Sequence, residues 1–243
     1  MTAAAVFVTA LVTALATGLG ALPFLFVRRP ARSWLGVATS IAAGAMAGAS
    51  VGLVWEGWHR GPGRVALGLA AGALFIALSR RALAHEGDRH FGSIAGADAV
   101  RMLLIVGVMT VHSFTEGVGV GVSFGEGEEF GLVIALAIAV HNIPEGLAIS
   151  LVLVPRGVSV GRSAAWSVFS SLPQPLMAVP AFVFVESFEA FLPVGLGFAA
   201  GAMAWMVASD LVPDAVREAP VWTVAVAAAV AGGAVIALQA ALL

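Results

Sequence analysis

Four ionisable residues stand inside long apolar stretches of the sequence: His112, Glu116, His141 and Glu145. Each histidine precedes a glutamate by four positions, and residues with that spacing lie on one face of a helix. Each stretch therefore offers one imidazole and one carboxylate, a turn apart. An unpaired carboxylate at the bilayer centre costs at least about 2.5–3.5 kcal/mol even on lenient insertion scales. Such residues persist when they pair, line water or bind an ion.

The two His–Glu pairs can converge, because they lie on consecutive apolar stretches joined by a short loop. Two imidazoles and two carboxylates suit a borderline divalent cation such as Zn²⁺, Fe²⁺, Mn²⁺ or Co²⁺. Asn142 and Ser113 add an amide oxygen and a hydroxyl beside the pairs, and Pro144 removes a backbone hydrogen bond and predicts a kink. The pattern predicts a metal site within the membrane.

Three other uses of these residues remain open from the sequence. His112 and His141 could be the axial ligands of an intramembrane haem, which leaves both glutamates unexplained. An intramembrane metalloenzyme is a second alternative, although a hydrolase of this kind would be expected to carry an H-E-x-x-H motif, which is absent. The pairs could also only hold helices together, but the repetition of the pattern disfavours that explanation.

The composition indicates a membrane protein. Of the 243 residues, 60% are hydrophobic and only 11% are charged, against roughly 25% in soluble domains, and the mean hydropathy is +1.01. The absence of cysteine excludes disulfides and thiolate metal sites, and the net charge of −2 argues against binding nucleic acid.

A helix needs about 20 mostly apolar residues to cross a bilayer. The sequence predicts an all-α integral membrane protein, surrounded by lipid, whose single transmembrane domain covers residues 1–243. The expected eight spans lie at about 3–27, 34–55, 65–84, 98–124, 130–154, 163–185, 190–212 and 220–243. The first tract lacks the basic region of a cleaved signal peptide and is expected to be a retained span.

The arginines predict the orientation of the chain. Ten lie in the odd-numbered loops and two, Arg60 and Arg64, in the even-numbered loops. Because cytoplasmic loops carry the excess of basic residues, we expect both termini of this multi-pass protein to be outside. The string Ala-Ala-Gly-Ala-Met occurs at 42–46 and again at 199–203. It suggests that spans 1–3 and 6–8 form an inverted repeat around spans 4–5, as in many secondary transporters.

Two strings resemble a known family. His-Ser-Phe-Thr-Glu-Gly at 112–117 and His-Asn-Ile-Pro-Glu-Gly-Leu-Ala at 141–148 are similar to the signature fourth and fifth helices of the ZIP (Zrt/Irt-like) metal transporters. The resemblance implies transport of divalent metals toward the cytoplasm across a bacterial inner membrane. Zinc is the first expectation, with iron, manganese and cadmium as alternates. It also implies that the chain is not an enzyme, needs no cofactor beyond the transported metal, and is compatible with a homodimer.

The resemblance implies that His112, Glu116, His141 and Glu145 are the primary ligands, with Asn142 and Ser113 as adjacent ligands or in the surrounding layer. The chain departs from members that hold two metals. Those have Asp at the position of Asn142 and Glu where this chain has Gln174, and often Asn where it has Ser113. Two negative charges are lost, so we expect one strong metal position and a weak or absent second one.

Other residues are candidates for the transport route. Met46 and Met203 could line it, although a methionine on an apolar helix more often only packs. Asp210, near the cytoplasmic end of the seventh span, either guides the metal out or marks the membrane interface. The resemblance implies alternating access, and we expect the glycine-lined faces of spans 2 and 7 to be contact surfaces for that motion.

Overall fold

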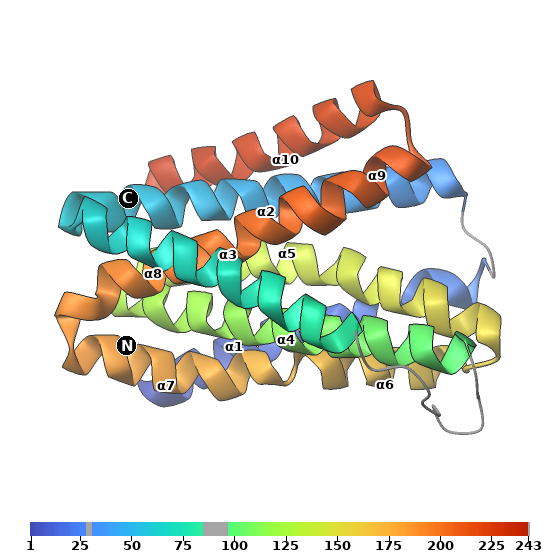
Figure 1. Ribbon diagram of the computed structural model, residues 1–243, viewed down its shortest axis with the longest axis horizontal. Helices are drawn as coiled ribbons and strands as arrows, with labels where there is room; N and C mark the ends of the chain where they lie inside the picture. Colours follow the sequence, from blue (N-terminus) through green and yellow to red (C-terminus); the bar gives the residue numbers. More distant parts are fainter. Residues whose placement is uncertain (28–30, 85–96, 243) are drawn as a thin grey trace.

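The computed structural model describes residues 1–27, 31–84 and 97–242, and every regular element in this part of the chain is helical (Figure 1). The long elements are α1 (Ala3–Leu19), α2 (Arg32–Arg60), α3 (Pro62–Ala84), α4 (Ala97–Glu126), α5 (Glu128–Leu153), α6 (Val160–Ser171), α7 (Pro173–Ser187), α8 (Leu192–Met206), α9 (Val212–Glu218) and α10 (Val221–Leu242). A π-helical segment (Val207–Leu211) joins α8 to α9, and short 3-10 turns lie at Leu22–Leu25, Val154–Arg156 and Glu189–Phe191.

Seven helical stretches among the described residues are long and apolar enough to cross a membrane, and α4 adds another helix of 30 residues. This confirms the all-helical membrane class. Two predicted spans are composite, because the sixth consists of α6 and α7 and the seventh of α8, the π-helical segment and α9. Both termini lie at the same end of the bundle, here called the terminal end, where α2 and α4 end and α5 begins (Figure 1).

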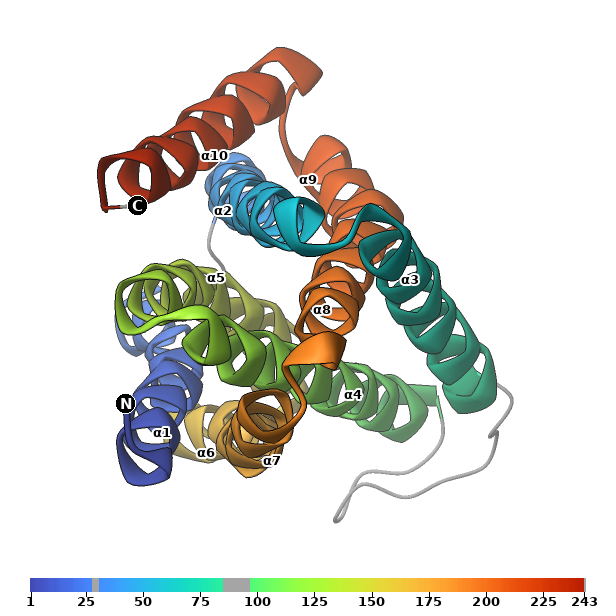
Figure 2. The ribbon, with the colours of Figure 1, turned by 90° about the vertical axis from the view of Figure 1, so that its left-hand side faces the viewer.

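The helices form two groups when seen from the terminal end (Figure 2). The site group comprises α1, α4, α5, α6 and α7, and the support group comprises α2, α3, α8, α9 and α10. Glycines bring backbones together within each group. A Cβ atom on Gly121 of α4 would lie 2.2 Å from the Ala178 carbonyl oxygen of α7, and one on Gly72 of α3 would lie 2.0 Å from that of Phe198 in α8. Small residues thus allow the close helix packing typical of membrane bundles.

The contact between the groups is different, as Gly119 of α4 illustrates. A Cβ atom there would meet the side chain of Ala199 at 3.2 Å and, among the described residues, no backbone atom of another helix within 4 Å. The glycine-lined faces of spans 2 and 7 lie against helices of the support group, and their part in the motion stays a prediction. A Cβ on Gly44 of α2 would lie 2.1 Å from the carbonyl oxygen of Ala228 in α10, within the support group. Gly201 of α8 faces α3 in the same way.

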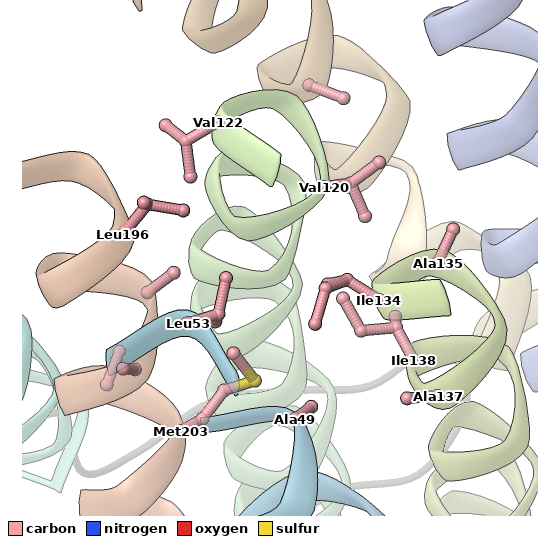
Figure 3. Close-up of a cluster of buried hydrophobic side chains, with 14 of the residues drawn as sticks. Ala49, Leu53, Val120, Val122, Ile134, Ala135, Ala137, Ile138, Leu196 and Met203 are labelled. Atoms are coloured by element: carbon pink, nitrogen blue, oxygen red, sulfur yellow. The ribbon is translucent and has the colours of Figure 1, made fainter. Parts of the chain in front are cut away.

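A buried apolar cluster fills the space between the groups near the terminal end (Figure 3). Its central side chains are at most 1% exposed, and we call them the apolar layer: Ala49 and Leu53 from α2, Val120 from α4, Ile134 and Ile138 from α5, and Leu196 and Met203 from α8. Val120 follows Glu116 by one helical turn toward the terminal end. The apolar layer therefore separates the predicted metal site from that end.

Met46 and Met203, the last residues of the two Ala-Ala-Gly-Ala-Met strings, both belong to this buried cluster. They come from α2 and α8, which run in opposite directions through the support group (Figure 1). The inverted repeat itself stays a prediction.

Candidate metal centre

The two His–Glu pairs meet between α4 and α5, deep in the bundle. All four side chains are at most 2% exposed, and one ligand atom from each lies within 4.8 Å of the others. The helical i,i+4 spacing places His112 one turn from Glu116 on α4 and His141 one turn from Glu145 on α5. The convergence predicted from the spacing is therefore observed.

The distances between the ligand atoms suit a small cation. His112 Nε2 lies 2.8 Å from Glu145 Oε1 and 3.2 Å from Glu116 Oε1. His141 Nε2 lies 3.1 Å and 3.6 Å from the same two oxygens, and the two Nε2 atoms are 3.4 Å apart. Ligands on a tetrahedron with bonds of about 2.0 Å are about 3.3 Å from one another. The five distances bracket that value.

Three of the four carboxylate oxygens lack other partners among the described residues. Apart from their approach to the imidazoles, Glu116 Oε1 and both oxygens of Glu145 are buried and accept no hydrogen bond from the described part of the chain. Buried polar atoms are nearly always satisfied in proteins, and buried charges are paired or bind metals. A divalent cation at the centre of the four residues would satisfy Glu116 Oε1 and Glu145 Oε1, the two oxygens that face the imidazoles.

Gln174 borders the site because the sixth span is interrupted. Pro173 has no N–H to continue the helix, so α6 ends and α7 begins there, and Gln174 is the second residue of α7. Its Nε2 donates hydrogen bonds to Glu116 Oε2 and, at 3.3 Å, to Asn142 Oδ1. Its Oε1 accepts one from Asn142 Nδ2 at 3.1 Å. Glu116 Oε2, which we call the outer oxygen, thus accepts an N–H from Gln174, while Oε1, the inner oxygen, faces the imidazoles.

The other predicted residues lie apart from the four ligand atoms. Ser113 is buried, and its hydroxyl has no hydrogen-bond partner among the described residues. Met46 packs in the buried apolar cluster. Asp210 lies in the π-helical segment, where it accepts a hydrogen bond of 2.8 Å from Ser209, and it is not one of the four residues that converge.

Thr13 of α1 is a neighbour of the site that the sequence analysis missed. Its Oγ1 donates to Gln174 Oε1 at 3.0 Å, and its carbonyl oxygen accepts from Asn142 Nδ2 at 2.7 Å. The available signal was the series Thr9, Thr13 and Thr17, spaced by four residues on one face of a span whose other residues are apolar.

The geometry does not suit a bis-histidine haem. Two axial nitrogens lie on opposite sides of the iron, about 4 Å apart for bonds of about 2 Å. Here the nitrogens are 3.4 Å apart, and oxygens of both glutamates lie within 3.6 Å of them, where a porphyrin would have to pass.

A bundle of membrane-spanning helices around buried imidazoles and carboxylates is the arrangement expected of a divalent-metal transporter. The family model described as ZIP Zinc transporter matches residues 77–240. The chain belongs to this ZIP family, whose members are transport proteins and not enzymes, and the predicted family is confirmed.

The relatives carry names that agree with this assignment. A "putative zinc transporter" of Arabidopsis thaliana is 50% identical over 232 residues, which are 94% of this chain but 37% of that protein. Zinc transporter GufA of Myxococcus xanthus is 35% identical over 226 residues, 86% of this chain and 88% of that protein. Zinc transporter ZIPB of Bordetella bronchiseptica is 34% identical over 135 residues, which are 55% of this chain and 43% of that protein.

Proposed function

We propose that this chain moves Zn²⁺ foremost, with Fe²⁺, Mn²⁺ and Cd²⁺ as alternates, across a bacterial cytoplasmic membrane toward the cytoplasm. His112, Glu116, His141 and Glu145 are the proposed ligands. The observation that carries the proposal is their geometry, because five distances between ligand atoms lie between 2.8 and 3.6 Å, close to the edges of a tetrahedral zinc site. The names of the relatives favour zinc.

The site is proposed to hold one ion. A second cation beside Glu116 would have to displace the Gln174 amide, whose N–H donates to the outer carboxylate oxygen. Asn142 and Gln174 are uncharged, so they cannot compensate a further divalent charge in a buried position.

Transport is proposed to follow alternating access. All four ligands belong to the site group, and the contact of Gly119 with the support group runs through side chains and not through interlocked backbones. Motion of the site group against the support group would therefore carry the ligands together. The apolar layer closes the route to the terminal end, which the arginine distribution places outside. The described conformation is then the one closed to the outside.

Metal entry should release protons. Metal-binding imidazoles and carboxylates must be deprotonated, so zinc and protons compete for the four ligands. Uptake at a fixed concentration of free zinc is expected to weaken in mildly acidic buffer.

The test is zinc uptake into proteoliposomes that contain a fluorescent zinc indicator. His141→Ala and Glu145→Ala should reduce uptake to the background of empty liposomes. Two matched controls, His59→Ala and Glu128→Ala, remove exposed residues of the same types, and Glu128 is on the same helix as Glu145. Uptake that survives Glu145→Ala would reject the ligand assignment. A native chain that carries none of the four metals would reject the transport function. Assembly as a homodimer stays a prediction, to be tested by the mass of the purified protein.

A further inference from the structure

Thr13 is the one described residue of α1 that contacts both amides beside the metal centre. Its side chain is 2% exposed. Its Oγ1 lies 3.0 Å from Gln174 Oε1 and 2.7 Å from the carbonyl oxygen of Ala10, and its own carbonyl oxygen lies 2.7 Å from Asn142 Nδ2. One threonine thus connects the first span to the fifth and seventh helices.

These contacts decide which way the two amides face. A backbone carbonyl can only accept, so it selects the orientation in which Asn142 presents Nδ2 to Thr13. Asn142 Nδ2 donates to Gln174 Oε1 at 3.1 Å, so Gln174 directs Nε2 toward Glu116. The Thr13 hydroxyl, whose single proton is shared between Gln174 Oε1 and the Ala10 carbonyl oxygen, adds a second donor to that amide oxygen. With the opposite orientation, an amide oxygen would face a carboxylate oxygen in a buried site, and neither could donate.

The approach of α1 to α5 makes these contacts possible. A Cβ atom on Gly146 would lie 1.7 Å from the Thr17 carbonyl oxygen, and one on Gly20 would lie 2.3 Å from that of Ile143. Both glycines are therefore needed where the helices touch. Thr13 lies one turn from Thr17 along the same face.

We propose that Thr13 is a positioning residue for the metal centre. Its hydroxyl and carbonyl hold Asn142 and Gln174 so that a Gln174 N–H binds the outer oxygen of Glu116. The inner oxygen then points at the imidazoles, 3.2 Å from His112 Nε2. Thr13 thereby sets the affinity of the site for one divalent cation. The inference rests on the proposed function, because it assumes that Glu116 is a ligand.

The test compares Thr13→Val, which keeps the shape and removes the O–H, with Thr13→Ser, which keeps the O–H. Thr17→Val is the matched control, because the Thr17 hydroxyl contacts Ser171 Oγ at 2.8 Å and neither amide. Zinc binding to the purified chain is measured by calorimetry, and uptake gives KM and Vmax. Thr13→Val should bind zinc about tenfold more weakly, as is typical when the support of a ligand is lost. Its KM should rise with little change in Vmax, while Thr13→Ser and Thr17→Val behave like the native chain.

A residue that only packs gives a different result. Thr13→Val would then unfold at a lower temperature without metal but bind zinc with native affinity, which overturns the proposal. If Thr13→Val does not fold, Thr13→Ala takes its place with the same expectations. Failure of the native chain to bind zinc would instead overturn the proposed function, so the two failures are distinguishable.

Discussion

Gly146→Ala is the substitution whose effect follows most directly from the structure. Gly146 follows the proposed ligand Glu145, and its added Cβ would lie 1.7 Å from the Thr17 carbonyl oxygen, whereas ordinary contacts begin at 3.4 Å. The obstacle is backbone, so no side chain can turn away. The two helices must separate by about 1.7 Å at this point, the difference between these distances.

That separation reaches the metal centre. The hydrogen bond between Asn142 Nδ2 and the Thr13 carbonyl is 2.7 Å long, and half of the displacement would stretch it past about 3.5 Å, where it no longer counts as a hydrogen bond. We expect zinc uptake to fall by about 10- to 100-fold, the range typical when the partners of metal ligands are lost. Overpacking of this kind should also destabilise the fold by about 1–3 kcal/mol.

The assay is the initial rate of zinc uptake per reconstituted molecule, together with thermal unfolding in detergent. Gly233→Ala is the matched control, because in the part of the chain that the structure describes no atom outside α10 lies within 4 Å of the added Cβ. It should keep the native rate and gain about 0.5–1 kcal/mol, since alanine suits a helix interior better than glycine. Native uptake and native stability in Gly146→Ala would refute the close contact of α1 and α5 and the inference drawn from it.

Three further predictions concern charged groups. Glu145→Gln keeps the shape but removes a ligand charge, so calorimetry should show zinc affinity reduced more than about 100-fold; a smaller loss would remove Glu145 from the ligands. Gln174→Glu places a second carboxylate next to that of Glu116. Two unit charges about 3 Å apart repel each other by about 5 kcal/mol at an effective dielectric constant of 20. Elemental analysis should then find two zinc ions per chain, and a single ion would contradict the role given to the amide. Burial raises the pKa of Glu126 at the terminal end of α4, and Arg60 opposes that rise. When folding raises the pKa of an acidic group, the folded protein loses stability as the pH rises through that pKa, because the group must ionise in an unfavourable place. Arg60→Gln should therefore be less stable than the native chain at about pH 7 and recover toward about pH 5, whereas a loss that does not vary with pH would argue against it.

The four central residues could be predicted because helical spacing alone places i and i+4 on one face. Charges in apolar stretches leave few alternatives to a buried site. Spacing by four marks Thr13 as part of a polar face, but it does not give the role of this residue, which depends on a carbonyl oxygen and on the approach of α1 at Gly146. No spacing within one helix encodes a contact between two distant helices.

The glycines also show that spacing within one helix does not identify the neighbouring helix. Spacing by four identified the faces of α2 and α8 that pack closely, but it could not name the neighbour. Gly44 packs against α10 and Gly201 against α3, so these faces stabilise the support group. The break before Gln174 was visible as Pro173, yet its consequence also depends on a partner. A Cβ on Gly117 of α4 would lie 2.5 Å from the Gln174 carbonyl oxygen, so this glycine lets α7 approach the site.

Charge connects the neutral amides to transport. Two carboxylates and one divalent ion sum to zero, so in the proposed transport step a loaded centre would carry no net charge beside the apolar layer. Uncompensated charge in such surroundings is costly, and Gln174 and Asn142 add none. A carboxylate in place of either would leave a net charge, unless a proton or a second cation were also taken up. The proposed single-ion site and its amide neighbours therefore belong together: in this proposal Thr13 holds uncharged donors at positions where additional acids would require additional cations.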